Sequence, residues 1–169
     1  MHFRNFKPFS KVSALTLGGG GIGQVWGETT KEEAIQTVHS ALDHGINHFD
    51  VAPMYGKGEA ERVLGESLNG KKKDNLFFTT KCQLGTLPED EVYDKLNSSL
   101  TKSLDNMKLN KVNLFLLHSQ LIEDNYKLFK FDELREKSAT TLSCFFNSVS
   151  MLLMPIFVMD MFLLTRNLR

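Results

Sequence analysis

The chain has 169 residues, of which 41% are hydrophobic and 24% charged, and its 20 basic and 20 acidic side chains give a net charge of zero. This composition is typical of one soluble globular domain that can bury a core. A balanced charge gives no electrostatic reason to expect binding to nucleic acid or to an anionic membrane. The two cysteines, Cys82 and Cys144, match neither a disulfide framework nor a metal-ligand spacing, so we expect a reducing, cytoplasmic location and no metal site.

Composition also changes along the chain. The first residues do not resemble a signal peptide, because Lys7, Pro8 and Lys11 interrupt what would have to be an apolar stretch. After Lys137 the last 32 residues carry only three charged side chains. We therefore expect a boundary near residue 138, with one domain at 1–137 and a divergent apolar tail at 138–169.

Before that boundary, short apolar runs alternate with helical stripes. Thr29 with Glu32 and Thr30 with Glu33 give overlapping capping-box signals for the first long helix, which Gly45 ends. In chain order the pattern predicts a strand at 14–17, this helix, a strand at 46–51, a helix at 59–68, a strand at 76–80, a helix opened by Pro88, a strand at 112–117 and a weaker helix at 123–137.

This order of elements favours a parallel sheet covered by helices. The predicted strands begin about 30 residues apart, which is the length of one strand–helix repeat. Their near-continuous apolar character indicates burial on both faces. The sequence therefore predicts an α/β fold built from βα units.

Polar side chains follow three of the four predicted strands. Asp50 ends the second strand, with Tyr55 just beyond it, while Lys81 ends the third and His118 the fourth. Because the carboxyl ends of parallel strands meet on one face, we expect these four side chains to converge there.

These four residue types suit the reduction of a carbonyl group. Hydride addition leaves an oxyanion that a tyrosine can protonate, and a lysine cation beside the tyrosine stabilises the phenolate. A buried lysine needs a carboxylate partner, which Asp50 can supply. His118 can hydrogen-bond the carbonyl and orient it. The hydride itself must come from a cofactor.

Residues 12–119 resemble the aldo-keto reductases. The resemblance rests on a glycine-rich first strand, the D-x-A-x-x-Y-G stretch from Asp50 to Gly56 with Glu61 following, a lysine after the third strand and a histidine ending the fourth. It implies that Tyr55 is the proton donor for a small-molecule aldehyde or ketone, and that Lys81 and Asp50 tune it. His118 would then orient the substrate.

The same resemblance implies a nicotinamide cofactor. Gly21, Ile22 and Asp50 would lie near its nicotinamide end. The resemblance implies NADPH as the cofactor, with NADH as the alternative.

The resemblance also implies a partial TIM (β/α)8 barrel. A complete barrel has eight βα units and about 250 residues, whereas four are recognisable here. We expect weak or no turnover from this chain, because the family holds much of its cofactor on the later units. The alternative is a non-catalytic half-barrel that acts as an interaction module, pairing with itself or with a full-length relative.

The apolar tail has three interpretations. We favour a non-family end produced by truncation or alternative splicing. A membrane anchor through residues 142–165 is less favoured, because the apolar run at 149–164 contains Pro155 and Asp160. The third interpretation is a helix that packs on the open sheet.

The glycine run also matches the pattern of a second fold. Gly18, Gly20 and Gly23 match the G-x-G-x-x-G pattern of a Rossmann-type dinucleotide-binding domain. That pattern requires a helix directly after the glycines, and none is predicted before about residue 29. The Rossmann interpretation also leaves Tyr55 and Lys81 unexplained.

Other residues have plainer interpretations. His39, His44 and His48 are expected on a helix face or in loops, since their spacing matches no zinc motif. Cys82 is expected to be an inert packing residue despite its neighbour Lys81. For Trp26, a wall of the substrate pocket and a cap on the barrel mouth are equally favoured.

Overall fold

The computed structural model describes residues 1–6 and 11–118. Strands and helices alternate through most of this part of the chain. The elements are β1 (Phe3–Asn5), β2 (Lys11–Ser13), β3 (Leu17–Gly18), α1 (Gly19–Ile22), α2 (Lys31–Asp43), β4 (His48–Asp50), α3 (Glu59–Ser67), β5 (Phe77–Cys82), α4 (Glu89–Met107) and β6 (Leu114–Leu117).

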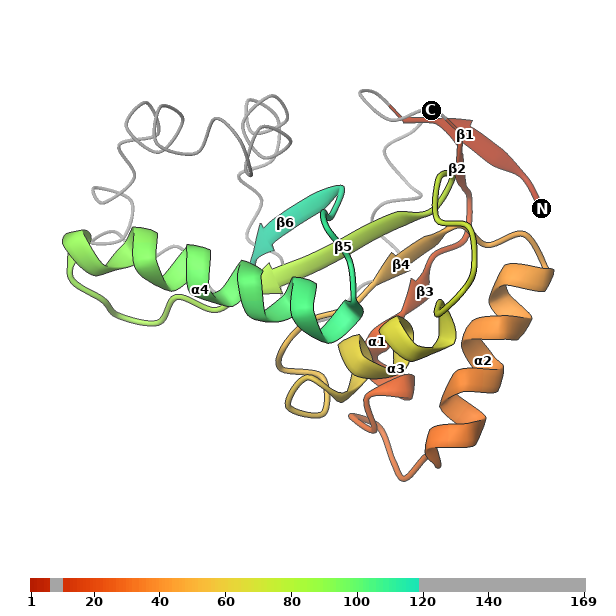
Figure 1. Cartoon of the computed structure of the whole chain (residues 1–169), viewed down its shortest axis with the longest axis horizontal. Coiled ribbons are helices and arrows are strands. Elements are labelled where there is room, and N and C mark those ends of the chain that lie inside the picture. The colour runs from red at the N-terminus through yellow and green to blue at the C-terminus, as the bar shows by residue number, and fades with distance from the viewer. Residues whose placement is uncertain (7–10, 119–169) are drawn as a thin grey trace.

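Four parallel strands form one sheet in the order β3-β4-β5-β6 (Figure 1). Sequence order and spatial order are the same, so each strand lies beside the one before it. In this register Asp50 is opposite Thr79, and Lys81 is opposite Leu116. The predicted α/β fold of successive βα units is confirmed, although β3 begins three residues later than the predicted first strand.

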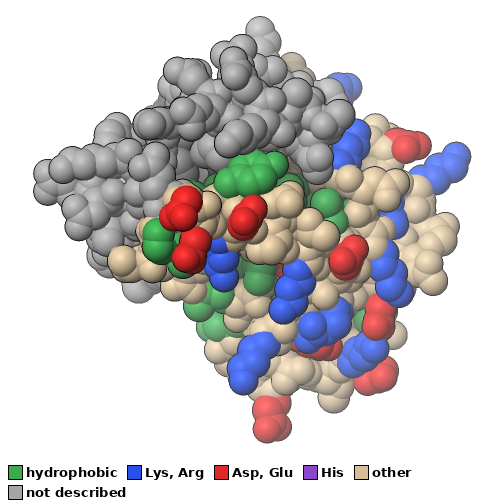
Figure 2. Space-filling model, turned by 60° about the vertical axis from the view of Figure 1, so that its left-hand side comes forward, with side chains coloured by type: hydrophobic (Ala, Val, Ile, Leu, Met, Phe, Trp, Pro, Cys, Tyr) green, Lys and Arg blue, Asp and Glu red, His purple; other side chains and the backbone are tan. Residues whose placement is uncertain are grey.

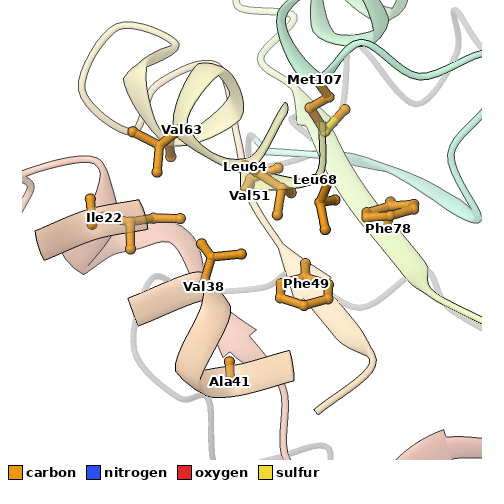
Figure 3. Close-up of a cluster of buried hydrophobic side chains, with 12 residues drawn as sticks. Ile22, Val38, Ala41, Phe49, Val51, Val63, Leu64, Leu68, Phe78 and Met107 are labelled. Carbon is orange, nitrogen blue, oxygen red and sulfur yellow. The ribbon is translucent and has the colours of Figure 1, made fainter. Parts of the chain in front are cut away.

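The larger hydrophobic core lies between this sheet and α2 and α3 (Figure 3). Phe49 and Phe78 project from β4 and β5 on the same side, with ring centroids 6.1 Å apart. Val38 from α2 and Leu64 from α3 pack against them and are fully buried. Burial of each such side chain stabilises the fold by about 1.5–3 kcal/mol.

A second cluster joins α4 to the same face of the sheet, at β5 and β6. Val92, Leu96 and Leu100 recur every four residues along α4 and pack against Phe115 of β6 and Cys82 of β5. This spacing places them on one helical face. The helix that follows Pro88 therefore forms as predicted and covers β5 and β6.

The opposite face of the sheet is more open than the sequence indicated. Phe77, Leu114 and Leu116 alternate with the buried residues and are only partly buried, as is Asp50. The prediction that the strands are buried on both faces is confirmed for most of β5, where Thr79 and Lys81 are buried on this face, and is wrong for β4 and β6. His48, Asp50 and Lys81 lie on this inner face.

An antiparallel hairpin of β1 and β2 covers the amino-terminal end of the sheet. Asn47, just before β4, accepts a hydrogen bond from the Ser13 backbone N–H at 2.8 Å and donates one to the Lys11 carbonyl at 3.0 Å. This hairpin is not among the elements predicted from the sequence. The hairpin thus lies at the opposite end of the sheet from the carboxyl ends of the strands.

Surface charge is mixed on the face that Figure 2 draws. Basic and acidic side chains are interspersed there, without one large area of a single sign. This distribution matches the zero net charge of the chain.

Several predictions concern residues that the structure does not describe. The helix at 123–137, the boundary at residue 138, the apolar tail and the possible anchor at 142–165 all lie outside the described residues. Within the described ranges, no helix is both long and apolar enough to cross a membrane.

The structure distinguishes between the two capping signals that precede α2. The Thr30 hydroxyl accepts a hydrogen bond from the Glu33 N–H at 3.2 Å, and the Glu33 carboxylate accepts one from the Thr30 N–H at 2.9 Å. Thr30 is thus the N-cap, and the pair forms a reciprocal capping box.

We expect Thr30→Ala to lower the free energy of unfolding by about 1 kcal/mol, because the first turn of α2 loses a side-chain acceptor. Urea unfolding followed by circular dichroism measures this change. Thr29→Ala is the matched control, since Thr29 precedes the cap, and it should cost clearly less. Equal losses in the two variants would contradict the assignment of Thr30 as the cap.

Candidate active site

An ion pair between neighbouring strands lies at the centre of the site. Asp50 ends β4, and the Lys81 ammonium from β5 contacts its Oδ1. Lys81 Nζ also donates a hydrogen bond to the Val51 carbonyl at 3.0 Å. The Lys81 side chain is only 8% exposed, whereas that of Asp50 is 36% exposed. The carboxylate thus supplies the counter-charge that a buried ammonium requires.

Tyr55 lies in the turn between β4 and α3. Its N–H donates to the Ala52 carbonyl at 3.0 Å, and its carbonyl accepts from the Ala60 N–H at 3.2 Å. These bonds fasten the turn to the first turn of α3. Lys81 Nζ lies 5.1 Å from the centre of the Tyr55 ring, which is within the range of a cation–π contact.

The glycine run packs against this turn. A Cβ at Gly56 would lie 2.3 Å from the Gly23 carbonyl oxygen, and Gly56 has a positive φ of 63°. A Cβ at Gly23 would lie 2.9 Å from the Tyr55 carbonyl carbon. Both positions therefore require glycine. The glycines let the segment after β3 touch the Tyr55 turn. This packing role was not predicted from the sequence.

His118 follows β6 and completes the cluster. Its N–H donates to the Cys82 carbonyl at 2.8 Å, and its ring meets the Tyr55 ring edge-on with centroids 5.7 Å apart. Burial lowers the pKa of the His118 imidazole, the Lys81 cation lowers it further, and Asp50 opposes them. Nδ1 is buried and has no hydrogen-bond partner among the described residues.

The structure therefore brings all four predicted catalytic residues together. Asp50, Tyr55, Lys81 and His118 come from three strand ends and one turn, and each contacts another member of the set. Their chemical roles stay predictions, because contact alone does not identify a proton donor.

The two predicted cofactor residues of the glycine run have different surroundings. A Cβ at Gly21 would meet nothing within 4 Å, so open space lies beside it. The Ile22 side chain is 4% exposed and belongs to the core. Ile22 can therefore meet a ligand through its backbone only.

Trp26 is 77% exposed, and its ring lies against the Gly20 backbone. With Gly21 and Ile22 it lines an open cavity of about 370 Å³ beside β3. Both predicted roles of Trp26, a wall of the substrate pocket and a cap on the barrel mouth, stay predictions.

The prediction that no helix begins before about residue 29 is wrong. A four-residue helix, α1, begins directly after β3, whereas no helix was predicted before about residue 29. The first long helix, α2, begins only at Lys31, so a loop separates it from the glycine run.

His48 is not the helix-face or loop residue that was expected. It lies in β4, and its ring nitrogens are 2.9 Å from the Thr16 hydroxyl and 2.8 Å from the Thr79 hydroxyl. Burial lowers the pKa of the His48 imidazole. His48 thus links the segment before β3 to β5. This link lies on the amino-terminal side of the Asp50–Lys81 pair. The inward direction of its side chain follows from its position two residues before Asp50 on the same strand.

Cys82 lies on the helix side of β5, so its side chain points away from that of Lys81. It is a free thiol and 1% exposed. Burial raises the pKa of this thiol, which makes it a poor nucleophile. Among the described residues, no group of three His, Cys, Asp or Glu side chains could hold a metal ion.

The position of Lys81 predicts a measurable effect on His118. In Lys81→Met we expect the pKa of the His118 imidazole to rise, because a nearby cation no longer opposes protonation while Asp50 still favours it. NMR titration of the histidine ring resonances measures this pKa. Lys31→Met is the control, since Lys31 pairs with Glu66 on the surface. A His118 pKa that is the same in wild type and Lys81→Met would contradict the arrangement.

Comparisons with known proteins agree with this geometry. The model of the Aldo/keto reductase family matches residues 14–141. L-galactose dehydrogenase of Arabidopsis thaliana is 31% identical over 110 residues, which are 64% of this chain and 34% of the plant protein. A thermostable aldo-keto reductase in complex with the inhibitor epalrestat superposes with a TM-score of 0.64 at 26% identity, covering 82% of this chain and 48% of that chain.

An aldo-keto reductase from Klebsiella pneumoniae in complex with NADPH has the same fold, with a TM-score of 0.61 at 20% identity, covering 80% of this chain and 45% of that chain. The present chain thus spans less than half the length of each of these three relatives. Its sheet and helices correspond to part of their barrels. The chain belongs to the aldo/keto reductase family.

Proposed function

We propose that this protein reduces an aldehyde or ketone to an alcohol with a nicotinamide cofactor, and that Tyr55 donates the proton. The observation that carries the proposal is the convergence of Tyr55 with Lys81 and His118 around the Asp50–Lys81 pair. Membership of an oxidoreductase family supports the same class of reaction.

The cluster suits proton delivery to a carbonyl oxygen. Lys81 places a cation beside the Tyr55 ring, where it stabilises the negative charge that remains on the phenolate after proton donation. Asp50 keeps that cation in place. His118 has a lowered pKa, so its neutral ring can donate a hydrogen bond to the carbonyl oxygen and polarise it.

The residues beside the cluster fit a nicotinamide cofactor. Open space next to Gly21 permits close approach of a flat ring to the backbone, and Asp50 is partly exposed on the same side of the strand ends. When bound, the cofactor supplies the hydride. Gly21, the Ile22 backbone and Asp50 would hold its nicotinamide end. We propose NADPH, because the Klebsiella relative is in complex with it.

Replacing the proton donor tests the proposal. In Tyr55→Phe, aldehyde-dependent NADPH oxidation should fall by about 10²–10⁴-fold, because general acid catalysis is lost. Absorbance at the nicotinamide band measures the rate, and fluorescence titration should show unchanged NADPH binding.

Tyr93→Phe is the matched control, since Tyr93 lies on α4 outside the cluster. An unchanged rate in Tyr55→Phe, or a wild-type rate no higher than background, would contradict the proposal.

A further inference from the structure

Glu61 is a buried acid outside the four-residue cluster. It lies in the first turn of α3, six residues after Tyr55, and its side chain is completely buried. Its Oε1 accepts a hydrogen bond from the Thr80 hydroxyl at 2.7 Å, and its Oε2 accepts one from the Asn106 amide at 2.9 Å. One carboxyl group thus joins α3 to β5 and α4.

Both partners of Glu61 lie next to residues of the active site. Thr80 directly precedes Lys81 on β5, with its side chain on the opposite face of the strand. A bond to Thr80 therefore fixes the stretch of β5 from which Lys81 projects. On the other side, Asn106 lies beside the Tyr55 turn, because a Cβ at Gly58 would be 3.1 Å from the Asn106 amide nitrogen.

The backbone packing keeps Asn106 within reach. A Cβ at Gly65 of α3 would lie 2.6 Å from the Asn106 carbonyl oxygen, so the end of α4 touches the backbone of α3 there. A second hydroxyl, that of Ser103, lies 3.4 Å from the Thr80 hydroxyl and is also buried. Glu61, Thr80 and Ser103 are completely buried, so the loss of one of these polar partners leaves the others without water as a replacement.

We propose that Glu61 is a positioning residue, which holds the Tyr55 turn and the Lys81 strand at the separation that proton donation needs. The inference rests on the proposed function for its catalytic consequence. Glu61 acts through two hydrogen bonds, one to each side of the site, and sets the distance of 5.1 Å between Lys81 Nζ and the Tyr55 ring. A residue that only stabilised the fold would not need to join the Tyr55 turn to the strand that carries Lys81.

The test compares Glu61→Met with Glu61→Gln. Methionine fills a similar volume but accepts no hydrogen bond from Thr80 or Asn106. Glutamine can accept from Thr80 and, once the Asn106 amide turns over, donate to its oxygen. We expect Glu61→Met to lower kcat by about 10²-fold, with the KM for the carbonyl substrate little changed, and Glu61→Gln to retain most of the wild-type kcat.

A second readout does not depend on activity. The nuclear Overhauser effect between the Tyr55 and His118 ring protons reports the edge-on contact of these rings. It should be retained in Glu61→Gln and weakened or lost in Glu61→Met. If wild type does not oxidise NADPH, the proposed function fails, while this ring contact still decides the positioning role.

Milder variants keep the test decisive if Glu61→Met does not fold. Thr80→Val removes only the hydroxyl that binds Glu61, and Thr80→Ser keeps it, so the ring contact and kcat should fall in the first and be retained in the second. Ser67→Ala is the control on α3, because the buried Ser67 hydroxyl bonds only within its own helix, to the Val63 carbonyl at 2.7 Å. A folded Glu61→Met or Thr80→Val with the wild-type ring contact would overturn the proposal, as would equal losses in Ser67→Ala.

Discussion

The ion pair between Asp50 and Lys81 is the interaction on which the site depends. The lysine is almost completely buried, and a buried ammonium is stable only with a counter-charge and hydrogen-bond acceptors around it. Asp50 and the Val51 carbonyl provide both from the neighbouring strand. The parallel register of β4 and β5 brings them within reach of Lys81. Lys81 in turn lies beside the Tyr55 ring, and its charge adds to the burial that lowers the pKa of the His118 imidazole.

Much of the fold could be predicted because the residues that cover the sheet obey simple periods. Val92, Leu96 and Leu100 identify α4 from their spacing, and the apolar runs identify β4 to β6. The hairpin of β1 and β2 escaped prediction because all three residues of β1 are exposed, so no apolar alternation marks it. The short helix α1 escaped because glycines disfavour helices in isolation. Position 23 requires glycine because its backbone touches the Tyr55 turn. This contact cannot be predicted from the local sequence.

The four-residue cluster could be predicted because strand ends of a parallel sheet share one edge. The supporting residues could not, because their partners are distant in sequence. Glu61 binds Thr80 and Asn106 across 19 and 45 positions, and nothing in its own neighbourhood signals burial. His48 likewise depends on Thr16 and Thr79, across 32 and 31 positions. The partial exposure of β4 and β6 on the inner face was not predicted, because an apolar run alone does not distinguish a covered face from one that lines a site.

The most direct test of this account is a double-mutant cycle on the central pair, measured by urea unfolding of wild type, Asp50→Asn, Lys81→Met and the double variant. If the two side chains support each other, their removal is not additive, and the account predicts a coupling free energy above about 0.5 kcal/mol. The double variant should then be little less stable than Lys81→Met alone. Additive losses, within about 0.3–0.5 kcal/mol, would contradict the claim that Asp50 and Lys81 act as one unit.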